Sequence, residues 1–520
     1  MSSALRYHEI GRVKSIRGCI AIVEGMHSCV NGQLVTIGVS TQATIVGFNQ
    51  EEAYALVLKE NEHIKTGDEV RASLEPFNVP VGDKFIGRIV DAMCEPQDSL
   101  GPIEAAAYNP IFPVAPMILD RQPLKLPLET GTKVLDTMIP IGLGQRQLIL
   151  GNKATGKTTF ITDVVLNQRD TDVICIYCAI GKARSQIARV VQLFQDHGAF
   201  DYSLIVSAPS SASAGQMYLA PYVACSLGEY WRDQGKHVFI GFDDFTKHAW
   251  AYREISLLLG RAPGRDSYPG DIFYLHSKMI ERACYLSKEK GAGSMTFFPI
   301  VEILEGDLTA FVPSNLVSMT DGQIYLDSQL FGEGQRPALD LGLSVSRVGS
   351  KVQWPIIKKL GGPLRLEYLQ YRELKRISQL TTTGQTDEQV ERLRNGEILT
   401  KLLRQYKDSP VKLEALAMIL YAYHRKYLQR LTLEEVDEFQ DNIYDYAKER
   451  SPEALELLRE RKNLDDEIEG LLNTLLEGYV KSFEARRPDE GGDAYGDNVL
   501  DGIGRDVLTE AQKRKETVKK

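Results

Sequence analysis

The sequence predicts a multidomain protein with an N-terminal β-barrel, a central α/β domain and a C-terminal α-helical domain. Three observations support this prediction: short β-rich runs up to Ala72, alternating strand and helix patterns from about Pro76, and helical patterns alone beyond Gln353. A chain of 520 residues is also too long for one hydrophobic core, so two to four domains are expected. The expected barrel, α/β domain, helical domain and charged tail span residues 1–74, 75–353, 354–483 and 484–520.

The barrel prediction rests on short apolar runs between Glu9 and Ala72. These runs are GRVKSI, CIAIVEG, QLVTIG, ATIVGFN and YALVLK, and Gly, Asn and charged residues separate them. Such residues are typical of the turns between short strands. The spacing of the runs therefore favours a small β-barrel.

Four strand-and-helix pairs predict a parallel sheet in the central domain. The pairs are QLILG with KTTFITDVVLNQ, DVICIYCAI with ARSQIARVVQLFQ, SLIVSAP with YLAPYVACSLGEYWRD, and HVFIGFDD with HAWAYREISLLLG. Consecutive strands that are joined through helices lie parallel and carry the helices on the faces of the sheet. We therefore expect helices on both faces.

Beyond Gln353 only helical patterns follow. Apolar residues recur every three or four positions in LEYLQYRELKRIS, DEQVERLRNGEILTKLLRQ, KLEALAMILYAYHRKYLQRL and ALELLRERKNLDDEIEGLLNTLLEGYVKSF. After Phe483 the segment EARRPDEGGDAYGDNVLDGIGRD is rich in Gly and Asp and poor in apolar residues. This composition predicts a flexible, solvated tail with a charged short helix at its end.

Composition narrows the classes of function. The net charge of −9 counts against sequence-independent nucleic-acid binding, which depends on concentrated Lys and Arg. No stretch reaches the roughly 18 apolar residues that span a bilayer, and residues 1–8 lack the apolar core of a signal peptide. The seven scattered cysteines favour free thiols in a reducing compartment. We therefore expect a cytosolic protein.

Cys175 and Cys178 have the spacing of a redox or zinc pair. They lie within DVICIYCAIG, which is predicted to be a strand, and residues three apart on a strand point to opposite faces. Two buried core thiols are therefore favoured over a functional pair.

A phosphate-binding loop follows the apolar strand QLILG and opens a helix. Its pattern G-x-x-x-x-G-K-[ST] is made up of Gly151, Asn152, Lys153, Ala154, Thr155, Gly156, Lys157 and Thr158. The glycines let backbone amides face phosphate oxygens, the lysine reaches the β- and γ-phosphates, and the last hydroxyl ligates Mg²⁺. The motif predicts binding of a nucleoside triphosphate.

The strand HVFIGFDD ends in Asp243 and Asp244, and Asp243 is the first choice for the carboxylate that holds Mg²⁺ through water. Hydrolysis also needs a group that accepts a proton from the attacking water or orients it. The usual place for that group is the end of the strand after the loop, where this chain has Lys182. A charged ammonium has no lone pair to accept a proton. The sequence therefore predicts a site that binds ATP without hydrolysing it.

At this point several long segments resemble the alpha, non-catalytic subunit of F-type rotary ATP synthases. They include EIGRVKSI, NVPVGDKFIGRIVDA, IPIGLGQRQLILG, AIGKARSQIA, HVFIGFDDFTKHAWAYREISLLLGRAPGRDSYPGDIFYLHSKMIERA and MTDGQIYLDSQLFGEGQRPALDLGLSVSRVGS, in family order. The resemblance spans Glu9 to about Phe483. It implies a barrel, a RecA-like P-loop nucleotide-binding domain and a helical domain. It also implies an alpha3-beta3 hexamer with catalytic beta subunits, a central stalk gamma subunit and a peripheral stalk, on the cytoplasmic side of the cell membrane.

The resemblance assigns the ligands of the nucleotide site as ATP or ADP with Mg²⁺. The phosphate loop keeps its family role, and Thr158 and Asp243 are implied as the Mg²⁺ side of the site. Phe331 and Arg336 in LFGEGQRP resemble the adenine-side contacts of the family. Gln405 in LLRQYKDSP resembles the glutamine close to the adenine.

Two further residues are implied to act on a neighbouring subunit. Arg347 in SVSRVG resembles the arginine that reaches into the adjacent catalytic beta site. Ser344 in the same segment resembles a position that the family needs for activity. From the residues alone, an arginine such as Arg347 is more often an ordinary surface ion-pair residue.

The chain departs from the family pattern at three positions of the nucleotide site. Alpha chains usually carry Gln where this chain has Lys182, Ala154 and Lys407. The usual N-terminal amphipathic helix that grips a stator subunit is also not evident before the barrel pattern, and the tail after Phe483 is additional. These features resemble the alternate, N-type branch of F-ATPases, which does without that stator subunit.

Two other classes of protein share parts of this domain plan. A catalytic rotary or export ATPase shares this domain plan, but it requires Glu at the position of Lys182. A hexameric nucleic-acid translocase of the same core fold requires a basic channel and stacking aromatics on the barrel, and CIAIVEGMHSCVNGQLVTIG offers neither. Whether the complex moves H⁺ or Na⁺ is decided by other subunits.

Overall fold

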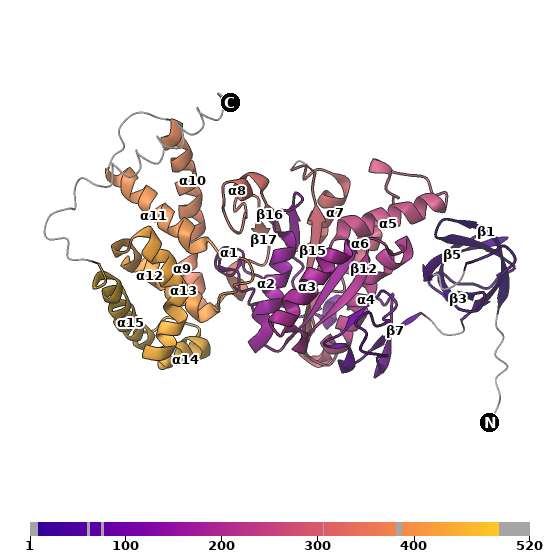
Figure 1. Cartoon of the computed structure of the whole chain (residues 1–520), viewed down its shortest axis with the longest axis horizontal. Helices are drawn as coiled ribbons and strands as arrows, with labels where there is room; N and C mark the ends of the chain where they lie inside the picture. The colour runs from indigo at the N-terminus through magenta and orange to yellow at the C-terminus, as the bar shows by residue number, and fades with distance from the viewer. Residues whose placement is uncertain (1–8, 60–62, 74–76, 305, 381–386, 488–520) are drawn as a thin grey trace.

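The computed structural model describes residues 9–59, 63–73, 77–304, 306–380 and 387–487. Its three domains lie in a row, with the barrel at one end, the α/β domain in the centre and the helical domain at the other end (Figure 1). This arrangement confirms the predicted fold class. Within the described residues, no helix is both long enough and apolar enough to cross a membrane.

Six antiparallel strands close the N-terminal barrel in the order β1-β2-β5-β4-β3-β6. They are β1 (Ile10–Arg17), β2 (Ile20–Glu24), β3 (Leu34–Ile37), β4 (Thr41–Phe48), β5 (Glu52–Lys59) and β6 (Glu69–Ala72). Alternate residues such as Val13, Val23 and Val35 fill the interior. The sixth strand, with the short sequence EVRA, was not among the predicted runs, and it completes the closure by pairing with β1 and β3.

The central domain is built on a mainly parallel sheet with the order β17-β16-β10-β15-β13-β11-β12-β8. Its parallel strands are β8 (Ile89–Val90), β10 (Leu148–Gly151), β11 (Val173–Lys182), β12 (Ser203–Pro209), β13 (His237–Asp243), β15 (Ser294–Glu302) and β16 (Gly322–Leu326). The strands β14 (Cys284–Tyr285) and β17 (Val345–Ser346) pair antiparallel with β15 and β16. A separate ribbon pairs β7 (Asn78–Val81) with β9 (Ala107–Pro110).

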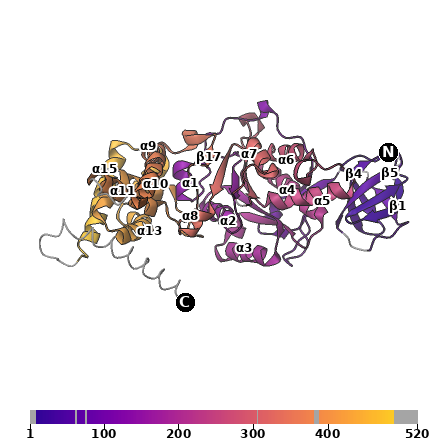
Figure 2. The same ribbon diagram turned by 90° about the horizontal axis from the view of Figure 1, so that it is seen from above.

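Helices cover both faces of this sheet, as predicted. One face packs against α1 (Lys133–Met138), α2 (Lys157–Asn167) and α3 (Arg184–Asp196). The other packs against α4 (Ala214–Arg232), α5 (Phe245–Leu258), α6 (Ile272–Ile280) and α7 (Phe311–Met319). Figure 2 shows α3 on one side of the domain and α6 and α7 on the other. The short helix α8 (Ser328–Gly332) follows β16.

Cys175 and Cys178 confirm the strand prediction for β11. Both are fully buried, and Cys175 lies in the core layer with α2 and α3 whereas Cys178 lies in the layer with α4 and α5. Burial raises the pKa of both thiols above the ordinary range. The two thiols therefore serve as core side chains and do not form a redox or zinc pair.

The C-terminal domain is entirely helical. Its helices are α9 (Pro355–Gly361), α10 (Leu364–Leu380), α11 (Asp387–Leu403), α12 (Leu413–His424), α13 (Leu433–Arg450), α14 (Pro452–Arg461) and α15 (Asp466–Glu484). All residues of α12 from Leu413 to Ala422 are buried, so this helix forms the centre of the domain. The tail predicted for 484–520 lies almost wholly outside the described residues, which end at 487.

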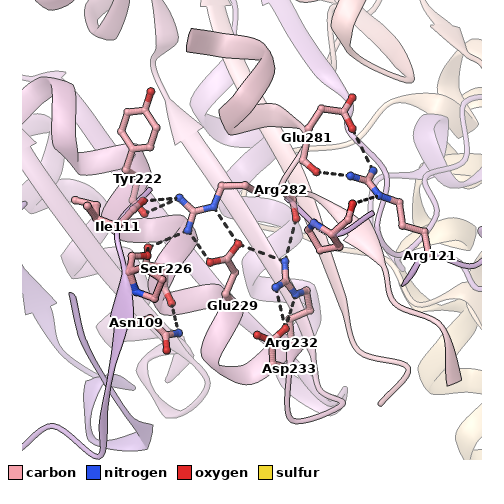
Figure 3. Close-up of polar contacts among 12 residues, drawn as sticks. Asn109, Ile111, Arg121, Tyr222, Ser226, Glu229, Arg232, Asp233, Glu281 and Arg282 are labelled. Carbon is pink, nitrogen blue, oxygen red and sulfur yellow. Dashed lines mark hydrogen bonds and ion pairs between the residues drawn. The ribbon is translucent and has the colours of Figure 1, made fainter. Parts of the chain in front are cut away.

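A buried ion cluster ties the segment after β9 to the sheet-covering helices (Figure 3). Arg282, just after α6, donates to both carboxylate oxygens of Glu229 on α4, at 3.0 and 2.6 Å. It also donates to the carbonyl oxygens of Ile111 and Tyr222 and to the hydroxyl of Ser226. These contacts use all five N–H groups of the guanidinium, which is 2% exposed.

Candidate functional site

A cavity of about 850 Å³ lies at the carboxyl ends of the central strands. Such a position is the usual place for ligands on parallel α/β sheets, because the loops after neighbouring strands converge there. One end of the cavity is formed by the phosphate loop between β10 and α2. The other end is formed by residues after α8 and by the loop after α11.

The phosphate loop adopts the turn that its motif predicts. Gly156 has a φ of 94°, and Ala154 also lies in the left-handed region with a φ of 63°. The ammonium of Lys157 donates to the carbonyl oxygens of Gly151, at 2.9 Å, and of Asn152. Burial lowers the pKa of Lys157. The lysine is thus folded over the loop, at the N-terminus of α2, where backbone amides favour an anion.

Thr158 and Asp243 lie together at the same end of the cavity. The Thr158 hydroxyl donates to Asp243 Oδ2 at 2.6 Å, and the Tyr177 hydroxyl donates to the same oxygen at 3.0 Å. Asp243 is fully buried. Its other oxygen, Oδ1, lies 2.5 Å from the ammonium of Lys182, which is also 3.5 Å from Asp244 Oδ2.

The fit of this donor set to Mg²⁺ is mixed. A hydroxyl and a carboxylate are the kinds of ligand that Mg²⁺ prefers, and Thr158 and Asp243 supply them. The charge of Asp243, however, is already neutralised by Lys182 in an ion pair. A divalent ion that used Asp243 would have to compete with this ammonium. The site therefore lacks the uncompensated carboxylate that the predicted Mg²⁺ role requires.

The residues predicted for the adenine side line the opposite end of the cavity. The Arg336 guanidinium lies 3.5 Å from the centre of the Phe331 ring and donates to the carbonyl oxygens of Phe331 and Gln335. These contacts stack the planar cation on one face of the aromatic ring. Both groups line the cavity and are of the kind that stacks on a planar base.

Gln405 lies beside Arg336, and both N–H groups of its side-chain amide donate to backbone carbonyls. Its Nε2 donates to the carbonyl oxygens of Gly131 and Ser409, at 2.7 and 2.8 Å, and its Oε1 accepts from the Lys133 N–H at 2.9 Å. Its own N–H donates to the Arg336 carbonyl. In this structure Gln405 therefore holds the loop after α11 in place beside Arg336.

Arg347 and Ser344 are not brought into this cavity. Arg347 follows β17 at the edge of the sheet and is exposed. Its backbone N–H donates to the Asp321 carbonyl, and its guanidinium makes a weak 3.4 Å contact with the Val317 carbonyl. Ser344 is fully buried, and its hydroxyl accepts from the Tyr325 N–H at 2.9 Å. The Ser344 side chain is therefore enclosed within this chain, and its contribution to a neighbouring catalytic site stays a prediction.

Three further residues line the cavity that sequence analysis missed. Glu302 ends β15 beside the loop strand, Asp163 lies on α2, and Tyr406 lies in the loop after α11. The signal for Glu302 is the same as for Asp243, a carboxylate at the end of an apolar strand. Burial raises the pKa of Asp163 to about 7. Lys407, one of the departures, also lines this end.

Comparisons with known proteins agree with this architecture. Residues 131–346 match the model of the ATP synthase alpha/beta family, nucleotide-binding domain, and residues 353–479 match that of the ATP synthase alpha/beta chain, C terminal domain. An ATP synthase subunit alpha from Clostridium botulinum (strain Eklund 17B / Type B) is 43% identical over 473 residues, with 91% of this chain and 94% of the relative covered. ATP synthase subunit alpha 1 from Methylococcus capsulatus (strain Bath) is 41% identical with the same coverage. The chain therefore belongs to the ATP synthase alpha/beta family and, within it, to the alpha subunits.

Proposed function

We propose that the chain is the regulatory, ATP- or ADP-binding alpha subunit of a rotary F-type ATP synthase. In this role it alternates with catalytic beta subunits in an alpha3-beta3 hexamer around a central stalk gamma subunit, and a peripheral stalk holds the hexamer on the cytoplasmic side of the cell membrane. The complex as a whole is an ATPase and ion translocase that moves H⁺ or Na⁺. The chain itself binds nucleotide without hydrolysing it.

The observation that supports the non-catalytic role is the place of Lys182. It ends β11 at the cavity, where a water-activating carboxylate is expected, and its ammonium is paired with Asp243. An ammonium donates hydrogen bonds and cannot accept the proton of an attacking water. Lys182 can hold phosphate oxygens, so it favours binding over hydrolysis.

Arg347 is proposed to act on the catalytic site of the adjacent beta subunit. Its guanidinium is exposed at a sheet edge and is free of carboxylate partners among the described ion pairs, while its backbone is fixed by Asp321. Asp321 is in turn held by Arg146, which pairs with its carboxylate at 2.7 Å. A fixed backbone with an extended charged fork is the geometry that an arginine needs to stabilise phosphoryl-transfer charge across an interface.

Substitution of Arg347 tests this role. In the assembled alpha-beta complex, Arg347→Lys and Arg347→Ala are expected to lower steady-state ATP turnover by on the order of 10³-fold, or about 4 kcal/mol of transition-state stabilisation. Lysine keeps the charge but loses the planar fork, so it does not rescue turnover. Nucleotide binding by the alpha chain itself is expected to stay unchanged.

Lys157→Ala is the matched control, because it removes a cavity ammonium and should weaken the chain's own nucleotide binding. Assembled Arg347→Ala complexes that turn over ATP at nearly wild-type rates would show that Arg347 is an ordinary interface residue.

We also propose that the complex is of the alternate, N-type branch, which does without one stator subunit. The additional segment after Phe483, which is rich in Gly and Asp, supports this placement. Purification of the chain with its native partners and identification of every subunit tests it. A stoichiometric copy of that stator subunit would contradict it.

A further inference from the structure

We propose that Lys182 serves as a built-in cation, so that this cavity binds the phosphates of ATP or ADP without a divalent metal ion. The inference rests on the proposed nucleotide site. It specifies that the ligand of this site is the metal-free nucleotide anion. It replaces the Mg²⁺ role predicted for Thr158 and Asp243.

The position of Lys182 is set by the backbone. Ala179 of β11 lies in register with Asp243 of β13, so the end of β11 runs directly beside the acid. Gly181 then turns with a φ of 64°, and a Cβ at this glycine would lie 2.8 Å from the Lys247 Cβ. Only glycine fits this close turn, and the turn directs the next side chain, Lys182, over the carboxylates.

Both carboxylate oxygens of Asp243 have a neighbour that stabilises the charge. Oδ2 accepts the Thr158 and Tyr177 hydroxyls, and Oδ1, which accepts no hydrogen bond, lies 2.5 Å from the Lys182 ammonium in an ion pair. The acid itself is fully buried, so its charge depends on these partners for stabilisation. Lys182 thereby supplies the positive charge that a metal ion would otherwise supply beside the phosphate loop.

Lys182 also remains open to the ligand. Its ammonium is paired with the two carboxylates, and its side chain is 17% exposed and lines the cavity. Lys182 and Lys157 therefore provide two ammonium groups for the phosphates.

A neighbouring lysine does not share this arrangement. Lys247 also lines the cavity, but its ammonium lies over the Trp250 ring, 3.7 Å from the ring centre. It is therefore engaged by an aromatic face and makes no ion pair with Asp243 among the described contacts. Of these two lysines, only Lys182 is therefore placed to take the role of the metal ion.

Equilibrium binding of the purified full-length chain tests the inference. ATP and ADP are titrated in excess Mg²⁺ and, separately, in excess EDTA. The wild-type dissociation constants are expected to agree within about threefold between the two conditions. Lys182→Gln is expected to lose about 10- to 100-fold of the metal-free affinity, as for one charge-assisted hydrogen bond, and to regain much of it with Mg²⁺. Lys182→Arg, which keeps the charge, should bind metal-free nucleotide like the wild type.

Mn²⁺ gives a readout that does not depend on turnover. Electron paramagnetic resonance should show nucleotide-supported Mn²⁺ binding by Lys182→Gln and little by the wild type, and addition of Asp243→Asn should abolish it. A wild-type chain that binds ATP only with Mg²⁺ overturns the inference and leaves the proposed nucleotide site intact. A wild-type chain that binds no nucleotide in either condition overturns the proposed function as well.

Discussion

Glu229 and Asp243 of the nucleotide-binding domain are both buried beside a cation, and the two clusters around them differ in how completely they are closed. Arg282 donates all five N–H groups inside the protein, two of them to Glu229, although it borders a second cavity of about 580 Å³ (Figure 3). Lys182 pairs with Asp243 but keeps donor capacity toward the larger cavity. The Arg282 cluster holds α4 and the segment after β9 together, whereas the Lys182 cluster is available to a ligand.

This difference shows that burial of charge alone does not identify a functional site. Both acids are almost inaccessible, and both are held by several hydrogen bonds. What separates them is the unused hydrogen-bonding capacity that faces a cavity. The comparison predicts that the Glu229 cluster contributes to stability and the Asp243 cluster to ligand binding.

The largest effect on stability is expected at Arg282. Arg282→Met leaves Glu229 buried with only the 3.4 Å contact from Arg232, and should lower the free energy of unfolding by about 3–5 kcal/mol. Lys182→Gln should cost less, because Asp243 keeps the Thr158 and Tyr177 hydroxyls and the amide can still donate to it. Denaturant unfolding of the full chain measures both.

The matched control for Arg282 is Arg392→Met, which removes an exposed pair with Glu388 on α11 and should cost less than about 0.5 kcal/mol. Equal losses for the Arg282 and Lys182 variants would remove the distinction between the two clusters.

Asp163 differs from Glu229 and Asp243 because it is a buried acid without an ion-pair partner among the described residues. Burial raises its pKa to about 7, and its Oδ1 accepts the Asp408 N–H at 3.0 Å, with Lys407 and the Asp408 carboxylate nearby. The folded state therefore holds a proton that the unfolded state, with a pKa of about 3.9, releases between pH 4 and 7. The contribution of this proton to the free energy of unfolding is therefore fully present below pH 4 and is lost as the pH rises through 7.

Asp163→Asn keeps an oxygen for the Asp408 N–H and removes the titration. The variant should match the wild type near pH 4 and be more stable at pH 8, by on the order of 2 to 4 kcal/mol. Asp136 has a similarly raised pKa of about 7, so the difference between the two stability curves isolates Asp163. Parallel curves from pH 4 to 8 would show that Asp163 does not titrate in this window.

Local patterns predicted the elements of the fold, because period-two and period-3.6 spacing are properties of neighbouring residues. They placed Cys175 and Cys178 on opposite faces of β11 and placed Asp243 at the end of β13. They missed β6, whose four residues carry too short a pattern to separate from a turn. They also identified Lys182 as the wrong residue for a base.

The contacts of the site could not be predicted in the same way, because they depend on strand order. The Lys182–Asp243 ion pair exists because β11 lies beside β13, and Glu302 reaches the cavity because β15 lies between β13 and β10. No local pattern specifies that order. The backbone partners of Gln405 likewise come from Gly131 and Lys133, which are distant in sequence.

Nucleotide binding and phosphate release, measured on the same sample of purified full-length chain at saturating ATP, test directly whether this chain is non-catalytic. We expect stoichiometric binding with negligible steady-state phosphate release, because Lys182 stands where a proton acceptor is required. Glu302→Gln should leave that low release unchanged. Robust phosphate release by the wild type that Glu302→Gln abolishes would show that the chain is catalytic and would identify Glu302 as the base.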